Sequence, residues 1–346
     1  MKIWGQDLSR REVEGYVGDL RQVADIRLAT LDDGMERGVR VADVRTGSGF
    51  DFTVLLDRGM DIGVATYNGI PLSWQSGTGA AHPSRYEPGG LGWLHTFHGG
   101  LLALCGLSQV GSANPLVDPE NGEILGQHGR IDNIPARDIR VERDWTNPAE
   151  PWTLRLTGIV EEVSLFGWRL RLERTMTVKV GSPELTIHDT VRNVSSQPAP
   201  LMILYHCNFG WPLVSPQSEI ISPTTKIAPR DKAAEAGIGN WNKMQAPTPG
   251  YAEQVFFHEV EPSEKLAVAA IHNKSLGIGL EVFFDSRTLP DLTEWKQMGF
   301  RDYTVGIEPG NCWPIGRVAT RQAGQLRMLQ PDESETFTVG FRVITL

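Results

Sequence analysis

The stretch WRLRLERTMTVKVGSPELTIHDTVRNV, residues 168–194, decides the fold class. Apolar and polar residues alternate along both halves, which is the pattern of β-strands that bury one face. The segment Gly181-Ser182-Pro183 separates the halves and predicts the turn of a hairpin. Two long strands joined by so short a connection indicate an antiparallel sheet.

The same alternation recurs on both sides of this hairpin. Upstream, residues 40–57 and 61–74 predict two more hairpins, the second around Asn68-Gly69. A helix is predicted only for residues 9–23, which begin with a capping box, and for a short segment at 230–237. With no internal repeat or linker in view, we predict an all-β fold: a large antiparallel β-sandwich with a short N-terminal helix, formed as a single domain over residues 1–346.

Composition excludes several classes of protein. The chain has 346 residues, 40% hydrophobic and 22% charged, which is typical of a globular protein. Its net charge of -9 argues against a nucleic-acid surface, which needs a basic stripe, and no apolar run is long enough to span a membrane. The first residues carry charges where a signal peptide needs an apolar core, so we expect a cytoplasmic protein.

The three cysteines are too few and too scattered for a disulfide framework or a zinc knuckle. Cys105, Cys207 and Cys312 form no CxxC motif. We expect them to be reduced, buried fillers.

Residues 75–136 interrupt the strand pattern. The segment is rich in Gly, His and Pro, with runs such as FHGGLLALCGL and LGQHGRIDNIPA. Long irregular segments in compact domains are uncommon and are frequently functional.

Two strand-like segments carry polar groups where a buried strand would not. In LMILYHCNFGWPLV, residues 201–214, alternation places His206 and Asn208 on one face and Tyr205 on the other. In YTVGIEPGN, Glu308 shares a face with Gly306, which leaves room for close approach. The structural alternatives are a hydrogen-bonded core histidine and a surface glutamate.

Other candidates lie at strand ends or in the irregular segment. His128 and Arg130 are two residues apart and face one way in an extended chain. Arg58 ends a strand before a glycine, with a surface ion pair to Asp57 or Asp61 as its alternative, and His98 could simply cap a turn. Imidazoles, carboxylates and guanidinium groups, together with the flat faces of Trp74 and Trp295, suit a sugar.

These segments resemble the galactose-mutarotase-like superfamily of aldose 1-epimerases, and most closely its DUF4432 branch. The matching pieces are LDRGMDIGVATYNGIPLSW, FHGGLLALCGL, GQHGRIDNIPA, LYHCNFGWPL and GIEPGN, spread over residues 56–311. The resemblance implies that superfamily's β-supersandwich and an isomerase that interconverts sugar anomers.

The resemblance also implies roles for individual residues. Glu308 matches the general base, His206 the general acid, and His128 a histidine at the anomeric centre. The superfamily's second, substrate-binding carboxylate has no clear match, with Glu259 and Asp291 as candidates. The remaining substrate-binding candidates are Arg130, Arg58, Asn208, Trp74, His98 and Trp295.

The implied reaction sets physical demands. We expect several ångströms and no direct hydrogen bond between His206 and Glu308, with a carboxylate raising the pKa of the histidine. Arg58 and Arg130 are expected to hold sugar hydroxyls or an acidic substituent. No metal or other cofactor is expected, since no HxH or HExxH spacing is present.

The expected partner is a monosaccharide or a modified sugar, without nucleic acid or membrane. The sequence leaves open which sugar it is and whether the chain forms a homodimer. Two other functions stay open as well: a lyase or another sugar isomerase on the same fold, and a sugar-binding protein without catalysis.

Overall fold

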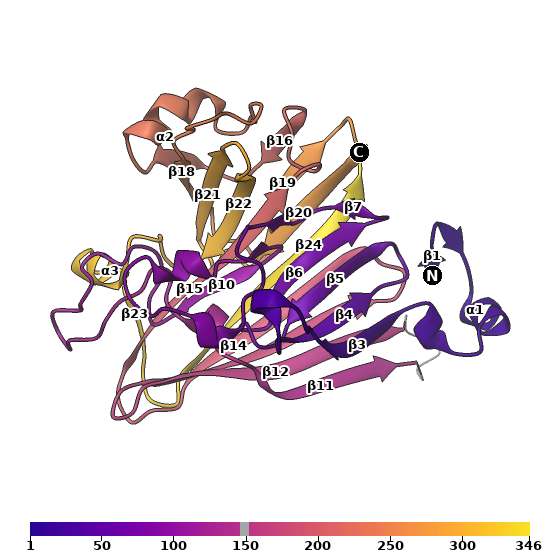
Figure 1. The fold of residues 1–346 in the computed structure, drawn as a ribbon, viewed down its shortest axis with the longest axis horizontal. Helices are drawn as coiled ribbons and strands as arrows, with labels where there is room; N and C mark the ends of the chain where they lie inside the picture. The colour runs from indigo at the N-terminus through magenta and orange to yellow at the C-terminus, as the bar shows by residue number, and fades with distance from the viewer. Residues whose placement is uncertain (146–151) are drawn as a thin grey trace.

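The structure is a computed structural model that describes residues 1–145 and 152–346. Within these ranges, strands dominate, and every pair of named strands is antiparallel. Three sheets, named A, B and C here, form the body of the molecule (Figure 1). The predicted all-β antiparallel sandwich is confirmed, while the prediction of a single domain over residues 1–346 stays a prediction.

Sheet A contains the hairpin of residues 168–194, whose turn places Gly181 at a φ of 82°, where a side chain would be strained. Its strand order among the described residues is β11-β12-β13-β14-β24-β20-β19-β16. The strands span β11 Arg137–Asp144, β12 Thr153–Val163, β13 Arg169–Lys179, β14 Glu184–Asn193, β16 Ser218–Ile221, β19 Ala267–Asn273, β20 Ile278–Phe284 and β24 Ser334–Thr345.

Sheet B contains both strands with unexpected polar residues. Its order in the described chain is β10-β15-β22-β21-β18-β17, and β23 also pairs with β15. The strands span β10 Ala103–Leu107, β15 Ala199–Gly210, β17 Lys226–Pro229, β18 Gln254–Glu259, β21 Asp291–Met298, β22 Tyr303–Gly310 and β23 Arg327–Leu329.

Sheet C is the N-terminal meander, in the order β3-β4-β5-β6-β7. Asn68 and Gly69 have φ values of 49° and 80° and join β6 to β7, as the predicted two-residue turn requires. Its strands are β3 Asp25–Thr30, β4 Arg40–Arg45, β5 Phe50–Leu55, β6 Asp61–Tyr67 and β7 Ile70–Pro71. Two small two-stranded sheets lie outside sheets A, B and C. One pairs β1 Lys2–Ile3 with β2 Gln6–Asp7, and the other pairs β8 Trp74–Gln75 with β9 Gly99–Gly100.

One face of sheet A is covered by both other sheets. Apolar side chains of sheets A and C meet around Phe52, Leu156 and Met176. Between sheets A and B, the Tyr205 hydroxyl donates to Asp189 Oδ2 at 2.7 Å. A single large core therefore joins the three sheets.

Sheet B has two different faces because its side chains alternate. Tyr205 and Cys207 of β15 belong to the core against sheet A, as the alternation predicted. Met202 and Leu204 belong to a second apolar cluster on the outer face, together with Trp93. Part of the irregular segment 75–136 covers this outer face.

The helices are short. The N-terminal helix α1 spans Arg10–Tyr16, capped by Ser9 with Glu12 as predicted. It ends well before residue 23, because Val17 is extended and Asp19 caps a separate 3₁₀ turn. The predicted short helix is α2, Lys232–Gly237, and a third helix, α3 Arg317–Gln322, was not predicted. The 3₁₀ turns are η1 Leu20–Gln22, η2 Gly34–Glu36, η3 Pro83–Arg85, η4 Gly92–His95, η5 Ile131–Asn133 and η6 Ile238–Asn240.

The three cysteines are free and buried, as expected. Within the described ranges, every helix is too short or too polar to cross a lipid bilayer.

Candidate active site

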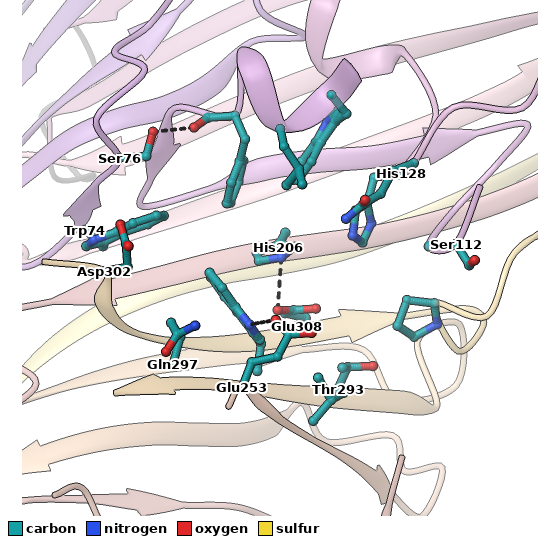
Figure 2. A pocket seen from close by; sticks show the side chains of 18 of the residues that line it. Trp74, Ser76, Ser112, His128, His206, Glu253, Thr293, Gln297, Asp302 and Glu308 are labelled. Atoms are coloured by element: carbon teal, nitrogen blue, oxygen red, sulfur yellow. Dashed lines mark hydrogen bonds and ion pairs between the residues drawn. The ribbon is translucent and has the colours of Figure 1, made fainter. Parts of the chain in front are cut away.

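A cavity of about 900 Å³ opens on the outer face of sheet B. Strands β15, β22 and β21 contribute His206, Glu308 and Trp295 to it. The irregular segment contributes Trp93 and His128. Figure 2 shows His128 across the cavity from Thr293 and Glu308. The interruption of the strand pattern thus coincides with a wall of the cavity.

His206 and Glu308 touch one another. Because Cys207 pairs with Ile307 across β15 and β22, their neighbours His206 and Glu308 face each other across the two strands. His206 Nε2 lies 3.2 Å from Glu308 Oε1, so the expected separation of several ångströms is wrong. The contact lacks hydrogen-bond geometry, since Glu308 Oε1 has no hydrogen-bond partner.

Burial controls the protonation of this pair. It raises the pKa of Glu308 well above its ordinary value, an effect increased by Glu253 and opposed by Arg230. It lowers the pKa of His206 to about 4, against a smaller opposing effect of Asn208. The expectation that a carboxylate raises the pKa of this histidine is therefore wrong: desolvation dominates at both groups, which favours the proton on Glu308 over His206.

Gly306 explains how the Glu308 carboxylate fits against the sheet. A Cβ atom at position 306 would lie 2.3 Å from Glu308 Oε1, too close for any real side chain. The room predicted at Gly306 is thus occupied by the Glu308 carboxylate itself.

Aromatic rings surround the His206 imidazole. The ring centroids of Phe97, Trp295 and His128 lie 5.2, 5.4 and 5.5 Å from it. Trp93 stacks on Phe97 at 4.2 Å, which fixes this wall. Burial, together with a smaller effect of His206, lowers the pKa of His128 to about 3, so His128 is a neutral hydrogen-bonding group near pH 7.

The predicted residues Trp74, His128, His206, Trp295 and Glu308 all line this cavity. It also contains groups that no motif indicated. Glu253 accepts a hydrogen bond from Trp295 Nε1 at 2.9 Å and pairs with Arg230 at 2.9 Å. Other polar residues that the sequence reasoning missed are Ser76, Ser112, Thr293, Gln297 and Asp302.

The carboxylates at the cavity differ from those proposed. Glu259 pairs with exposed Lys226, and Asp291 lies opposite Glu259 at the far end of β18 and β21. Neither lines the cavity, whereas Glu253 and Asp302 do. Glu253 immediately precedes a strand and Asp302 follows a turn, positions that carry no local signal of function.

Three of the predicted polar residues are buried beside the cavity without lining it. Arg58 is fully buried, with its guanidinium donating to the carbonyls of Ala81, Thr96 and Asp132. Asn208 Nδ2 donates to the carbonyls of His206 and Gly99. His98 is also buried, so none of the three can contact a ligand directly in this geometry.

Arg130 lies in a different place from the expected one. It pairs with Glu123 at 2.8 Å and lies 3.7 Å from Glu162. It borders a much smaller hollow and not the main cavity. Arg58 and Arg130, which we expected to hold an acidic substituent, therefore bond to other groups of the protein and do not line the cavity.

Among the described residues, no three His, Cys, Asp or Glu side chains gather as a metal site requires.

The sequence model of the DUF4432 family, described as a domain of unknown function, matches residues 36–343. No protein with a curated description matches the chain. Among solved structures, a candidate aldose 1-epimerase from Klebsiella pneumoniae is similar, with a TM-score of 0.84, 27% identity, and coverage of 92% of this chain and 83% of that one.

Two more distant structures share the fold. A galactose mutarotase-like protein from Clostridium acetobutylicum has a TM-score of 0.67 at 13% identity, covering 94% of this chain and 100% of its own. The galactose 1-epimerase from Lactobacillus acidophilus has a TM-score of 0.59 at 14% identity, with 93% and 99% covered. The mutarotase-like fold is thereby established for this chain.

Proposed function

The chain belongs to the DUF4432 family, and from its cavity we propose that it is an aldose 1-epimerase, a mutarotase that interconverts the anomers of a sugar. The single observation that carries the proposal is the His206–Glu308 contact at 3.2 Å in the wall of a cavity of about 900 Å³. A mutarotase needs one group that removes a proton and one that delivers a proton. A buried, touching pair of this kind supplies both.

The short contact suits the chemistry of the anomeric carbon. The anomeric hydroxyl oxygen and the ring oxygen are bonded to the same carbon, C1. Two catalytic groups that act on these oxygens must both reach the same edge of one sugar ring, and His206 and Glu308 are close enough to do so. Opposite placement across a wide cleft would leave one of the oxygens out of reach.

In the proposed reaction, ionised Glu308 takes the proton of the anomeric hydroxyl and protonated His206 gives a proton to the ring oxygen. The electrons of the broken O–H bond form the C1 carbonyl as the bond from C1 to the ring oxygen breaks. The aldehyde then rotates about the C1–C2 bond and recloses on its other face. Burial raises the pKa of Glu308 and lowers that of His206, so the proposal requires a proton to pass from Glu308 to His206 before the ring opens.

The charges of the cavity favour a neutral sugar. Among the described residues that line it, Arg230 is the only Arg or Lys. Its guanidinium already pairs with Asp231 and Glu253. Asp302 adds a further acidic group, so a phosphate or carboxylate on the sugar would be repelled.

A lyase reaction is less well supported. Such an enzyme commonly uses a tyrosine as its base. The hydroxyl of Tyr205 donates to Asp189 in the core, and that of Tyr303 donates to the Gln245 carbonyl at 2.6 Å. Neither tyrosine lines the cavity.

The direct test is exchange NMR of anomeric protons across a panel of neutral aldoses. We expect at least one aldose to exchange faster with the protein than without it. Failure of every aldose to do so, while a sugar raises the melting temperature, would establish the alternative of a binding protein without catalysis. Formation of a new unsaturated product would establish a lyase.

A further inference from the structure

The cavity is larger than one sugar ring requires. Its volume of about 900 Å³ lies near the upper end of the range of roughly 300–1,000 Å³ found for drug-sized ligands. Figure 2 shows His206 and Glu308 in its middle, between Trp74, Asp302 and Gln297 at one end and Ser112 and His128 at the other. A ring that reacts at the pair therefore leaves space unfilled.

Strand β21 runs from the His206–Glu308 pair to the end of the cavity that holds Trp74, Asp302 and Gln297, so its length gives the distance between them. Thr293, Trp295 and Gln297 alternate onto the same face and all line the cavity. Thr293 lies opposite Glu308, and Gln297 lies opposite Thr304. At about 3.3 Å per residue, Gln297 is roughly 13 Å along the strand from Thr293. That length exceeds one pyranose ring.

The groups at this end have the chemistry of a sugar subsite. The indole rings of Trp74 and Trp295 meet edge to face at 6.0 Å, offering apolar surfaces to the C–H faces of a ring. Trp295 is held in place by its hydrogen bond to Glu253. Gln297 Oε1 has no hydrogen-bond partner, and the Asp302 carboxylate also faces the cavity.

Unpaired polar atoms continue along the same wall toward the pair. Thr293 is 1% exposed and its hydroxyl has no hydrogen-bond partner. Buried polar groups are normally paired, so each exception needs a reason. A ligand with hydroxyls along its whole length would supply partners to both Thr293 and Gln297.

We propose that Trp74, Trp295, Gln297 and Asp302 form a second subsite, and that the substrate is a neutral reducing disaccharide or longer oligosaccharide. The reducing ring lies over His206 and Glu308, and the next ring lies against Trp74. Trp295, 5.4 Å from the His206 imidazole and 6.0 Å from Trp74, borders both rings. A 4-linked sugar fits this arrangement, because its linkage leaves the reducing ring on the side opposite C1. The assignment of the reducing ring rests on the proposed mutarotase function.

The first test compares disaccharides with the monosaccharide at their reducing end. Glucose is paired with maltose and with cellobiose, xylose with xylobiose, and mannose with mannobiose, in exchange NMR of the anomeric protons. We expect a kcat/KM at least tenfold higher for the disaccharide in at least one pair. Equal or lower values for every disaccharide would overturn the proposal.

The second test uses variants of the subsite. In Gln297→Ala and Trp74→Ala, the ratio of disaccharide to monosaccharide kcat/KM should fall about tenfold, mainly through a higher KM for the disaccharide. Gln245→Ala is the matched control, since Gln245 is exposed and does not line the cavity. An unchanged ratio in both subsite variants contradicts the proposal.

Binding measured by saturation-difference NMR separates the two proposals. If no sugar exchanges but a disaccharide binds more tightly than its monosaccharide and Gln297→Ala removes that difference, the subsite stands and the mutarotase function fails. If monosaccharides exchange and disaccharides gain nothing in either assay, the function stands and the subsite fails.

Discussion

Sheet B holds two buried His–Glu pairs that differ in their surroundings. His206 and Glu308 join β15 to β22, with Nε2 and Oε1 at 3.2 Å. His258 and Glu294 join β18 to β21, with Nε2 and Oε2 at 3.0 Å. The residue types, the sheet and the degree of burial are the same.

The second pair is closed off by protein. His258 Nδ1 lies 3.3 Å from the Ser222 hydroxyl, and Trp241 packs edge-on against the imidazole at 5.1 Å. Alternation places Glu294 on the face of β21 opposite Thr293 and Trp295, away from the cavity.

Each pair has an unpaired polar atom, Glu294 Oε1 in one and His206 Nδ1 in the other, but only His206 and Glu308 line the cavity. A His–Glu pair therefore indicates function only where it meets a cavity.

Replacing the glutamate of each pair with glutamine, Glu308→Gln and Glu294→Gln, is the strongest test of the difference between the two pairs. Glu308→Gln should lower the rate of anomer exchange by about 10²–10⁴-fold, because it removes the proton acceptor. Glu294→Gln should leave the rate within about threefold, since it lies outside the cavity. Exchange NMR at saturating sugar measures both. A Glu308→Gln protein with full activity would remove Glu308 from the mechanism.

For stability we expect the opposite order: a substitution in the closed pair, His258–Glu294, should cost more than one in the cavity pair, His206–Glu308. His258→Ala leaves Glu294 without its hydrogen-bond partner in a dry interior, which should cost about 3–5 kcal/mol of unfolding free energy. His206→Ala should cost less than about 2 kcal/mol, because burial already favours a protonated, neutral Glu308 that loses no charged partner. Urea unfolding followed by tryptophan fluorescence tests this ranking, and equal losses would contradict it.

The pH dependence of stability sharpens the contrast between the glutamates. The folded-state pKa of Glu308 is raised, so folding favours its proton, and the stabilisation present at low pH is lost as the pH rises from the unfolded-state pKa. Glu308→Gln should thus melt close to the wild type near pH 4 and above it at pH 8.

Glu294→Gln is the control for this pH dependence. The pKa of Glu294 is also raised by burial, but His258 and Lys296 oppose the effect. Relative to the wild type, the melting temperature of Glu294→Gln should therefore rise less between pH 4 and pH 8 than that of Glu308→Gln. Parallel curves for the two variants would show that the two carboxyl groups share one environment after all.

The smallest expected effect tests the two faces of the sheet. Tyr303 lies on the same strand as Glu308 but on its other face, and its hydroxyl donates a hydrogen bond to the Gln245 carbonyl. Tyr303→Phe should cost about 1 kcal/mol of stability and leave anomer exchange unchanged. A large loss of activity with normal stability would instead support a tyrosine base and a different reaction.

The local part of this structure could be predicted from sequence. Period-two alternation assigned the faces of β15, and the Asn68-Gly69 turn and the Ser9 cap are encoded by adjacent residues. These features depend on steric preferences within a few residues of chain. For the same reason, His206 and Glu308 could be selected as polar exceptions in apolar strands.

What could not be predicted depends on pairing between distant strands. His206 and Glu308 are separated by about a hundred residues, and only the register of β15 with β22 brings them into contact. Arg58 ends a strand as a surface residue would, yet chain from residues 81–132 folds over it. Glu253, Gln297 and Asp302 belong to no motif, and only the assembled sheet gathers them.

Because the cavity wall comes from dispersed segments, we expect the cavity to be completed late in folding. Trp74, His128, His206 and Glu308 come from segments spread over most of the chain. Such non-local arrangements form slowly, because each requires distant segments to meet. During refolding from denaturant, turnover should consequently return with the slowest kinetic phase, and no proteolytic fragment that lacks either β15 or β22 should recover it.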